Sequence, residues 1–137
     1  MTQKIKSIVL IDDDLAINYF HKRLFVKLEL GENVLSFFNS YEALEGLVKL
    51  GQTLTEEDLV YVFLDLNMPD IDGWSFLEEF NKINKLLKFE VKIFILSSST
   101  NPEDVEKAQK NNFVTNYFAK PLMMDGILAL KEMYSTV

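Results

Sequence analysis

Charged and hydroxyl side chains stand at the ends of four apolar runs in this sequence. Three aspartates follow the first run, one aspartate ends the third, three serines end the fourth, and a lysine follows the fifth. In chain order these residues are Asp12, Asp13, Asp14, Asp65, Ser97, Ser98, Ser99 and Lys120. Carboxylates that cluster without thiols or imidazoles form a hard oxygen site of the kind that Mg²⁺ prefers. With a hydroxyl and a lysine nearby, such a site suits phosphoryl transfer to a carboxylate.

The segments that must position these residues alternate between the hydrophobic pattern of a strand and that of a helix. Apolar runs rich in β-branched and aromatic residues predict five strands, at residues 5–11, 33–37, 59–64, 91–96 and 115–118. Each run precedes a segment with helical spacing, and start signals such as Asn39 and Asn101-Pro102-Glu103 agree. We therefore predict an α/β fold with a doubly wound, five-stranded parallel sheet. Ligands bind such sheets at the carboxyl ends of the strands, where the charged residues stand.

The length, charge and composition of the chain exclude several classes of protein. The chain has 137 residues, of which 48% are hydrophobic, and this suits one globular domain. Its net charge of −7, without a basic patch, argues against binding to nucleic acid or to an anionic membrane. The first apolar run, residues 8–11, is too short for a signal peptide or a membrane span. We therefore expect a cytoplasmic protein.

Four motifs give this pattern a family resemblance. IDDD, LDLNMPDIDG, ILSSS and YFAKPL occur in this order at the ends of the first, third, fourth and fifth predicted strands. Together they resemble the receiver domain of two-component response regulators, of the stand-alone type of the chemotaxis response regulator. The resemblance extends over essentially the whole chain and implies a flavodoxin-like (βα)5 fold with strand order 2-1-3-4-5. Because only 17 residues follow Lys120, we expect a single receiver domain over residues 1–137 with no output domain.

The resemblance implies a chemical role for the acidic residues. Asp65 would be the phosphoacceptor, taking its phosphoryl group from a phosphohistidine on a sensor histidine kinase or a histidine phosphotransfer protein. Asp12 and Asp13 would bind Mg²⁺ together with Asp65 and the main-chain carbonyl of Asn67. Such a domain is a signalling module and not an enzyme, since it catalyses only its own phosphorylation and dephosphorylation.

The resemblance also implies a switch. Lys120 would pair with a phosphoryl oxygen, and the peptide bond to Pro121 would be cis. Ser97 would hydrogen-bond the phosphoryl group, and Ser97 and Tyr117 would shift inward on phosphorylation. Residues 104–118 and 123–134 would then form the face that binds an unknown downstream protein target, unless the phosphoryl group is relayed to another histidine.

Each of these residues has a plainer interpretation too. Asp12 and Asp13 could be solvated charges, and Tyr117 could be a core aromatic. Ser97 and Lys120 gain their interest only from the motifs around them. Asp65 differs, because a carboxylate at the end of an apolar strand is costly to bury without a partner.

Other residues are expected to be structural. Asp14 should cap the helix that begins near Leu15. His21 is expected at the surface or at its boundary. Pro69 and Gly73 should shape the loop after Asp65, with Gly73 supplying backbone freedom. The connection at residues 49–58 is longer than is typical of the family, and its role is open.

Two other functions fit parts of the pattern. A phosphatase of the haloacid-dehalogenase type also forms an aspartyl phosphate with magnesium at a strand end. It normally has a second aspartate two residues after the nucleophile, where this chain has Asn67. A pseudo-receiver, which binds partners without control by phosphorylation, is the other alternative, although the complete set of acids, serine and lysine disfavours it.

Overall fold

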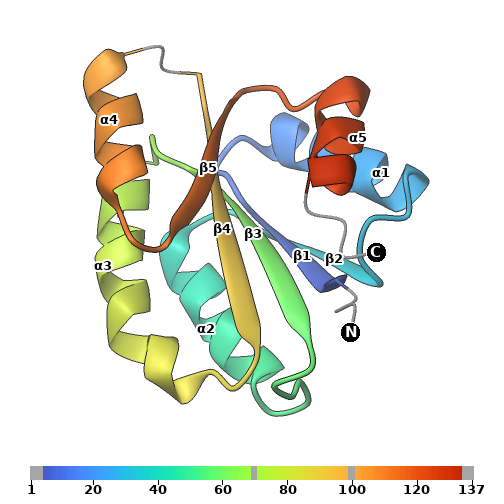
Figure 1. The fold of residues 1–137 in the computed structure, drawn as a ribbon, viewed down its shortest axis with the longest axis vertical. Helices are drawn as coiled ribbons and strands as arrows, with labels where there is room; N and C mark the ends of the chain where they lie inside the picture. The colour runs from blue at the N-terminus through green and yellow to red at the C-terminus, as the bar shows by residue number, and fades with distance from the viewer. Residues whose placement is uncertain (1–4, 69–70, 99–100, 134–137) are drawn as a thin grey trace.

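The computed structural model describes residues 5–68, 71–98 and 101–133. Strands and helices alternate along these residues (Figure 1). The strands are β1 (Ile5–Ile11), β2 (Asn33–Phe37), β3 (Leu59–Asp65), β4 (Glu90–Ser97) and β5 (Val114–Ala119). The α-helices are α1 (Leu15–Lys27), α2 (Ser40–Leu50), α3 (Gly73–Ile83), α4 (Pro102–Lys110) and α5 (Met124–Met133), and a 3-10 turn (Asn84–Leu86) follows α3.

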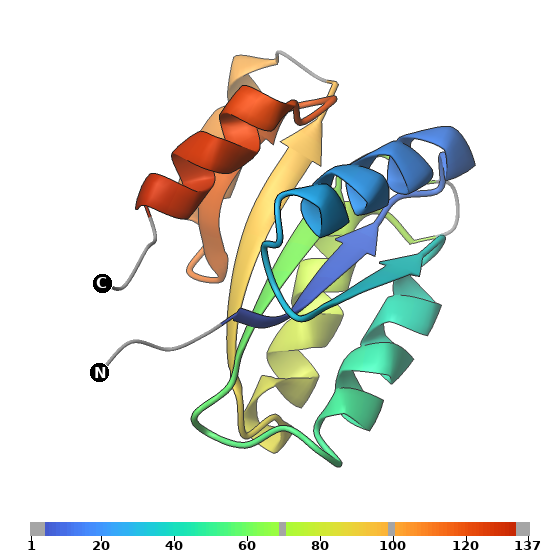
Figure 2. The ribbon, with the colours of Figure 1, turned by 90° about the vertical axis from the view of Figure 1, so that its right-hand side faces the viewer.

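The strands form one parallel sheet in the order β2-β1-β3-β4-β5. Helices α1 and α5 cover one face of this sheet, and α2, α3 and α4 cover the other (Figures 1 and 2). The strand order reverses between β1 and β3, so the carboxyl ends of these neighbouring strands border the expected ligand crevice. This arrangement confirms the predicted doubly wound, flavodoxin-like fold and its strand order.

Strand β3 is the centre of the core. All seven of its residues are buried. Val60, Val62 and Leu64 join the hydrophobic cluster under α2 and α3, whereas Tyr61 and Phe63 join the cluster under α1 and α5. A strand with helices on both faces must be apolar on both sides, which explains the unbroken hydrophobic run in the sequence. Asp65, the last residue of β3, is buried as well, and it belongs to the candidate functional site.

Polar side chains fix where the helices begin. Oδ1 of Asp14 accepts a hydrogen bond from the Ile17 N–H at 3.1 Å, so Asp14 caps α1 as predicted. Asn39 and Asn101 cap α2 and α4 in the same way. These caps satisfy amide groups that would otherwise lack partners in the first turn of each helix.

The connection at residues 49–58 packs against the domain. Helix α2 includes its first two residues and ends at Leu50. Leu54 is buried in the core cluster, and Oδ2 of Asp58 accepts a hydrogen bond from the Thr55 N–H at 2.8 Å. The extra length therefore forms a capped turn with its own apolar anchor.

Gly73 is required by close packing at the end of β3. A Cβ atom at this position would lie 2.8 Å from the Asp65 carbonyl oxygen and 2.9 Å from the Leu66 Cα atom. Among the described glycines only Gly31 has a positive φ, so the backbone freedom predicted for Gly73 is not the reason for glycine here. The reason is that α3 starts directly against the strand end that carries Asp65. Pro69, the other residue expected to shape this loop, lies outside the described residues.

Replacing Gly73 with alanine is expected to lower the free energy of unfolding by about 1–3 kcal/mol, because the added methyl group meets main-chain atoms that cannot rotate away. Urea-induced unfolding measures the change. Gly126→Ala in α5 is the matched control, since its added methyl group meets side-chain atoms of Leu122, with Cδ1 at 2.8 Å and Cγ at 3.6 Å, and no main-chain atom of the described residues outside its own helix. Equal stability of the two variants would show that β3 and α3 are less tightly packed than the structure indicates.

None of the helices within the described ranges combines the length and the apolar character needed to cross a bilayer.

Candidate functional site

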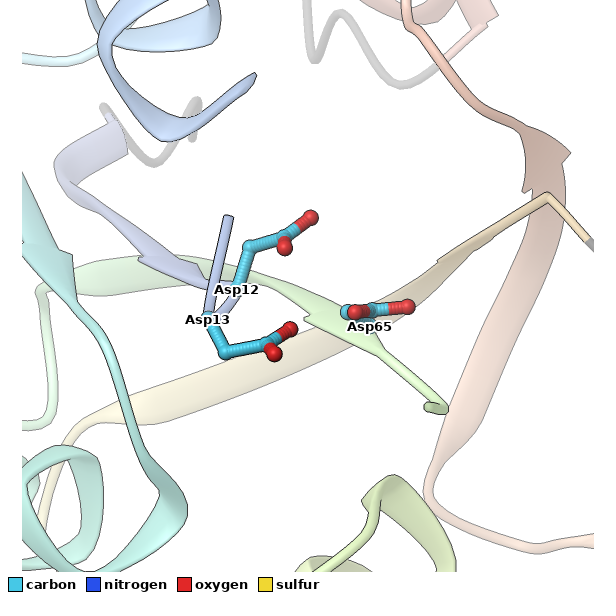
Figure 3. Close-up of side chains that lie close together, drawn as sticks. All are labelled: Asp12, Asp13 and Asp65. Atoms are coloured by element: carbon cyan, nitrogen blue, oxygen red, sulfur yellow. The ribbon is translucent and has the colours of Figure 1, made fainter. Parts of the chain in front are cut away.

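Three carboxylates gather beyond the ends of β1 and β3. Asp12 and Asp13 come from the segment after β1, and Asp65 is the last residue of β3 (Figure 3). One oxygen of each carboxylate lies within 4.8 Å of the other two. Asp12 and Asp65 are buried, with 4% and 3% of their surfaces exposed, whereas Asp13 is exposed. Residues more than fifty positions apart in the chain thus meet because parallel strands end at the same edge of the sheet.

Lys120 completes this cluster from the end of β5. Its Nζ lies 2.9 Å from Oδ2 of Asp12 and 3.5 Å from Oδ2 of Asp65. The main-chain N–H of Lys120 donates to the carbonyl oxygen of Ser97, at the end of β4, at 3.0 Å. The Lys120-Pro121 peptide bond is cis, in agreement with the resemblance. One ammonium group therefore bridges the two buried acids.

Main-chain amides hold the other oxygens of these acids. The Asp14 N–H donates to Oδ1 of Asp12 at 2.9 Å, and the Asn67 N–H donates to Oδ1 of Asp65 at 3.3 Å. Each buried carboxylate therefore has one oxygen on an amide and the other facing Lys120. The carboxylates of Asp12 and Asp65 are therefore both oriented toward the Lys120 ammonium group.

The charges of the cluster are not balanced. Burial, followed by the charge of Asp12, raises the pKa of Asp65 to about 6, although Lys120 opposes the shift. Burial alone would lower the pKa of Lys120, but its hydrogen bond to Asp12 and the charges of both acids outweigh this and raise it. At neutral pH the site thus has three acidic side chains and a single lysine. A hard divalent cation such as Mg²⁺ fits this donor set, because carboxylate oxygens are its preferred protein ligands and its charge offsets the surplus.

Replacing Asp65 with asparagine is expected to stabilise the metal-free protein by about 1–3 kcal/mol at about pH 7. The folded-state pKa of about 6 lies above the ordinary value of 3.8, so the folded protein binds this proton more tightly than the unfolded chain. The stability that the protonated Asp65 side chain contributes to the fold is fully present below pH 3.8 and is lost as the pH rises through about 6. The advantage of Asp65→Asn should therefore shrink below about pH 5, as measured by urea-induced unfolding in chelator. An asparagine variant no more stable than wild type at neutral pH would contradict this charge balance.

The predicted switch residues lie on the neighbouring strands β4 and β5. Ser97 ends β4 and is fully buried, and its carbonyl oxygen accepts the Lys120 N–H. Tyr117 is half-buried on β5, opposite Ile95 of β4, and borders a groove of about 250 Å³ between α4 and β5. Their roles in switching stay predictions, and Ser99 and Tyr134 lie outside the described residues.

Two buried polar residues of α1 were missed by the sequence analysis. His21 is 1% exposed, so its predicted surface or boundary position is wrong. Its Nε2 accepts a hydrogen bond from the Leu122 N–H at 2.9 Å, and burial lowers its pKa to about 4. Asn18, also 1% exposed, donates from Nδ2 to the carbonyl oxygens of Asp12 and Phe37, both at 3.0 Å. The spacing of Asn18, His21 and Phe25 along one helix face was the signal that could have revealed their burial.

Comparison with known proteins identifies the family. The sequence profile of the response regulator receiver domain matches residues 8–132. A curated relative, the "Probable methanogenesis regulatory protein FilR2" of Methanothrix harundinacea, is 30% identical over 66 residues, or 48% of this chain. The match covers 41% of that relative, so this chain spans about two-fifths of its length.

Solved structures agree with this family. A two-component response regulator from Cytophaga hutchinsonii is 27% identical with a TM-score of 0.79, over 95% of this chain and 96% of that one. A response regulator receiver protein from Dyadobacter fermentans has a TM-score of 0.80 at 23% identity, over 93% and 96% of the two chains. The chemotaxis protein CheY4 of Vibrio cholerae shares the fold, with a TM-score of 0.70 at 18% identity over 94% and 98%. The chain belongs to the response regulator receiver domain family of two-component signalling.

Proposed function

We propose that this domain is the phosphoacceptor of a two-component system or phosphorelay, and that Asp65 takes the phosphoryl group. The observation that carries the proposal is the environment of Asp65. Its carboxylate is buried at the end of the central strand, within 4.8 Å of Asp12 and Asp13 oxygens and 3.5 Å from the Lys120 ammonium group. An acid that served only the fold would not need two further acids beside it, since like charges oppose its burial.

The proposed reaction transfers a phosphoryl group from a histidine of a partner. That histidine belongs to a sensor histidine kinase or a histidine phosphotransfer protein. A carboxylate oxygen of Asp65 attacks the phosphorus atom, a P–O bond forms, and the P–N bond to the partner's imidazole breaks with its electron pair going to nitrogen. Because the pKa of Asp65 is about 6, the attacking carboxylate is ionised at neutral pH. Lys120 and the Ser97 hydroxyl would then bind oxygens of the transferred group.

The acidic residues would hold the metal ion that this transfer requires. Asp12, Asp13 and Asp65 supply carboxylate oxygens, and the main-chain carbonyl of Asn67 is proposed as a further ligand. Bound Mg²⁺ would neutralise negative charge on the phosphoryl oxygens.

The proposed output is a change of surface. Phosphorylation would draw Ser97 and Tyr117 inward and alter the face formed by α4, β5 and α5, to which a downstream protein target binds. Relay of the phosphoryl group to another histidine is the other output that this chemistry allows. The cytoplasmic location and the single-domain organisation also stay predictions.

Intact mass after incubation with acetyl phosphate tests the proposal. We expect one phosphoryl adduct in the presence of Mg²⁺ and none after chelation. A known receiver domain, labelled in parallel, shows that the conditions are sufficient. If only the known receiver gains an adduct, the pseudo-receiver alternative replaces the proposal, and the unmodified protein becomes the form whose partners matter.

A further inference from the structure

We propose that His21 is a positioning residue, which anchors the loop after β5 through the Leu122 N–H and so holds Lys120 between Asp12 and Asp65. The inference rests on the proposed function of Asp65, which it extends to a residue on α1 outside the four motifs.

The hydrogen bond of His21 determines the protonation state of its imidazole and holds the loop after β5. Its Nε2 accepts from the Leu122 N–H at 2.9 Å, so the imidazole is neutral and carries its proton on Nδ1. His21 is 1% exposed and Leu122 is 3% exposed. Water is therefore excluded from this N–H, and loss of the imidazole nitrogen would leave a buried donor without a partner.

Main-chain hydrogen bonds hold the loop on both sides of Pro121. Proline has no N–H, so Lys120 and Leu122 supply the main-chain donors on either side of Pro121. The Lys120 N–H donates to the Ser97 carbonyl oxygen at 3.0 Å, which ties the loop to β4. The Leu122 N–H donates to His21, which ties it to α1. The Lys120 side chain projects between these two anchors and reaches Asp12 at 2.9 Å.

Helix α1 also holds Asp12, the acidic partner in the ion pair with Lys120. Asn18, three residues before His21, donates to the carbonyl oxygen of Asp12 at 3.0 Å. Asn18 and His21 also surround, together with Asp12 and Asp65, a packing gap that is too small to hold a water molecule. One face of α1 thus contacts the residue that supplies the acid and the loop that supplies the lysine. Such a support sets the distance between the two charges.

Three variants separate positioning from simple packing. His21→Gln keeps an acceptor oxygen at a similar reach from the backbone. His21→Leu keeps an apolar side chain of useful size but removes the acceptor. Phe25→Leu, at a fully buried position of α1 that packs against Phe63, lowers stability without removing a hydrogen-bond acceptor from the loop. The free energy of unfolding of each variant is measured first, by urea, so that all rates refer to folded protein.

The rate of phosphoryl incorporation from acetyl phosphate, at saturating Mg²⁺, is the first readout. We expect His21→Leu to be about 10-fold to 100-fold slower than wild type, because small displacements of a catalytic group have effects of this order. His21→Gln should recover most of the rate, and Phe25→Leu should keep it despite its lower stability. A wild-type rate for His21→Leu, or equal slowing of all three variants, would overturn the proposal.

The NMR signals of the Leu122 amide and the Lys120 ammonium group are the second readout, and they do not require phosphorylation. His21→Leu should remove the exchange protection of the Leu122 amide and shift the Lys120 signal, whereas His21→Gln should preserve both. If wild type takes up no phosphoryl group, the proposed function fails, but these signals still decide whether His21 positions Lys120. Unchanged Lys120 signals in His21→Leu would overturn the positioning role by itself.

Discussion

Asp65→Asn is expected to slow phosphoryl incorporation by at least about 100-fold, to a level below detection in an intact-mass time course. Asparagine keeps the shape of the side chain and one acceptor oxygen, which can take the place of the carboxylate oxygen that faces either the Asn67 N–H or the Lys120 ammonium group. Its amide oxygen is neutral and does not attack phosphorus at a useful rate. Because this variant should also be more stable than wild type, unfolding cannot account for the loss. The comparison is made at neutral pH with saturating Mg²⁺ and acetyl phosphate.

Asp125→Asn is the matched control for this loss. Asp125 is an exposed acid in the first turn of α5 and is not part of the carboxylate cluster. Its replacement changes the net charge by the same amount but leaves the site intact, so the rate should equal that of wild type. Incorporation into Asp65→Asn at the wild-type rate would show that another side chain accepts the phosphoryl group.

Lys120→Met is expected to lower the free energy of unfolding of the metal-free protein by about 3–5 kcal/mol. The side chain of Lys120 is 14% exposed, and those of Asp12 and Asp65 are 6% and 4% exposed. Without the ammonium group, two buried acids face each other with no positive partner. Mg²⁺ should recover much of the loss, since it supplies the missing positive charge, and should stabilise this variant more than wild type. Urea-induced unfolding with and without Mg²⁺ measures both effects.

Two further variants show whether charge is the cause. Lys82→Met removes an exposed lysine that lies 3.0 Å from Glu79, and should change stability by less than about 1 kcal/mol. In an Asp65→Asn background, the effect of Lys120→Met should shrink, because one of its two charged partners is already gone. The same loss in both backgrounds would mean that the contribution of Lys120 does not depend on the charge of Asp65.

The strands and the helix starts could be predicted because local patterns determine them. The predicted third strand, residues 59–64, differs from the observed Leu59–Asp65 by one residue. A central strand of a parallel sheet is apolar on both faces, and few other structures produce such a run. Asp14, Asn39 and Asn101 were recognisable as caps because their side chains act on amides only two or three residues away.

Features that depend on contacts between distant segments could not be predicted in the same way. His21 and Asn18 are polar residues on a helix, and their type alone favours the surface. They are buried because each finds a main-chain partner in a loop that is remote in sequence, at Leu122, Phe37 and Asp12. The residues of the carboxylate cluster could be identified from the sequence. That Lys120 contacts both Asp12 and Asp65 could not, because these contacts depend on distances in the folded chain.

The most direct test of the central claim is to find the amino acid that carries the phosphoryl group. Borohydride reduces an acyl phosphate to an alcohol, and so converts a phosphorylated aspartate to homoserine. After incubation with acetyl phosphate and Mg²⁺, reduction and peptide mapping should reveal homoserine at position 65, and none in a sample with chelator. Homoserine at another acid, or an adduct that leaves aspartate at position 65 after reduction, would contradict the assignment of Asp65 as the phosphoacceptor.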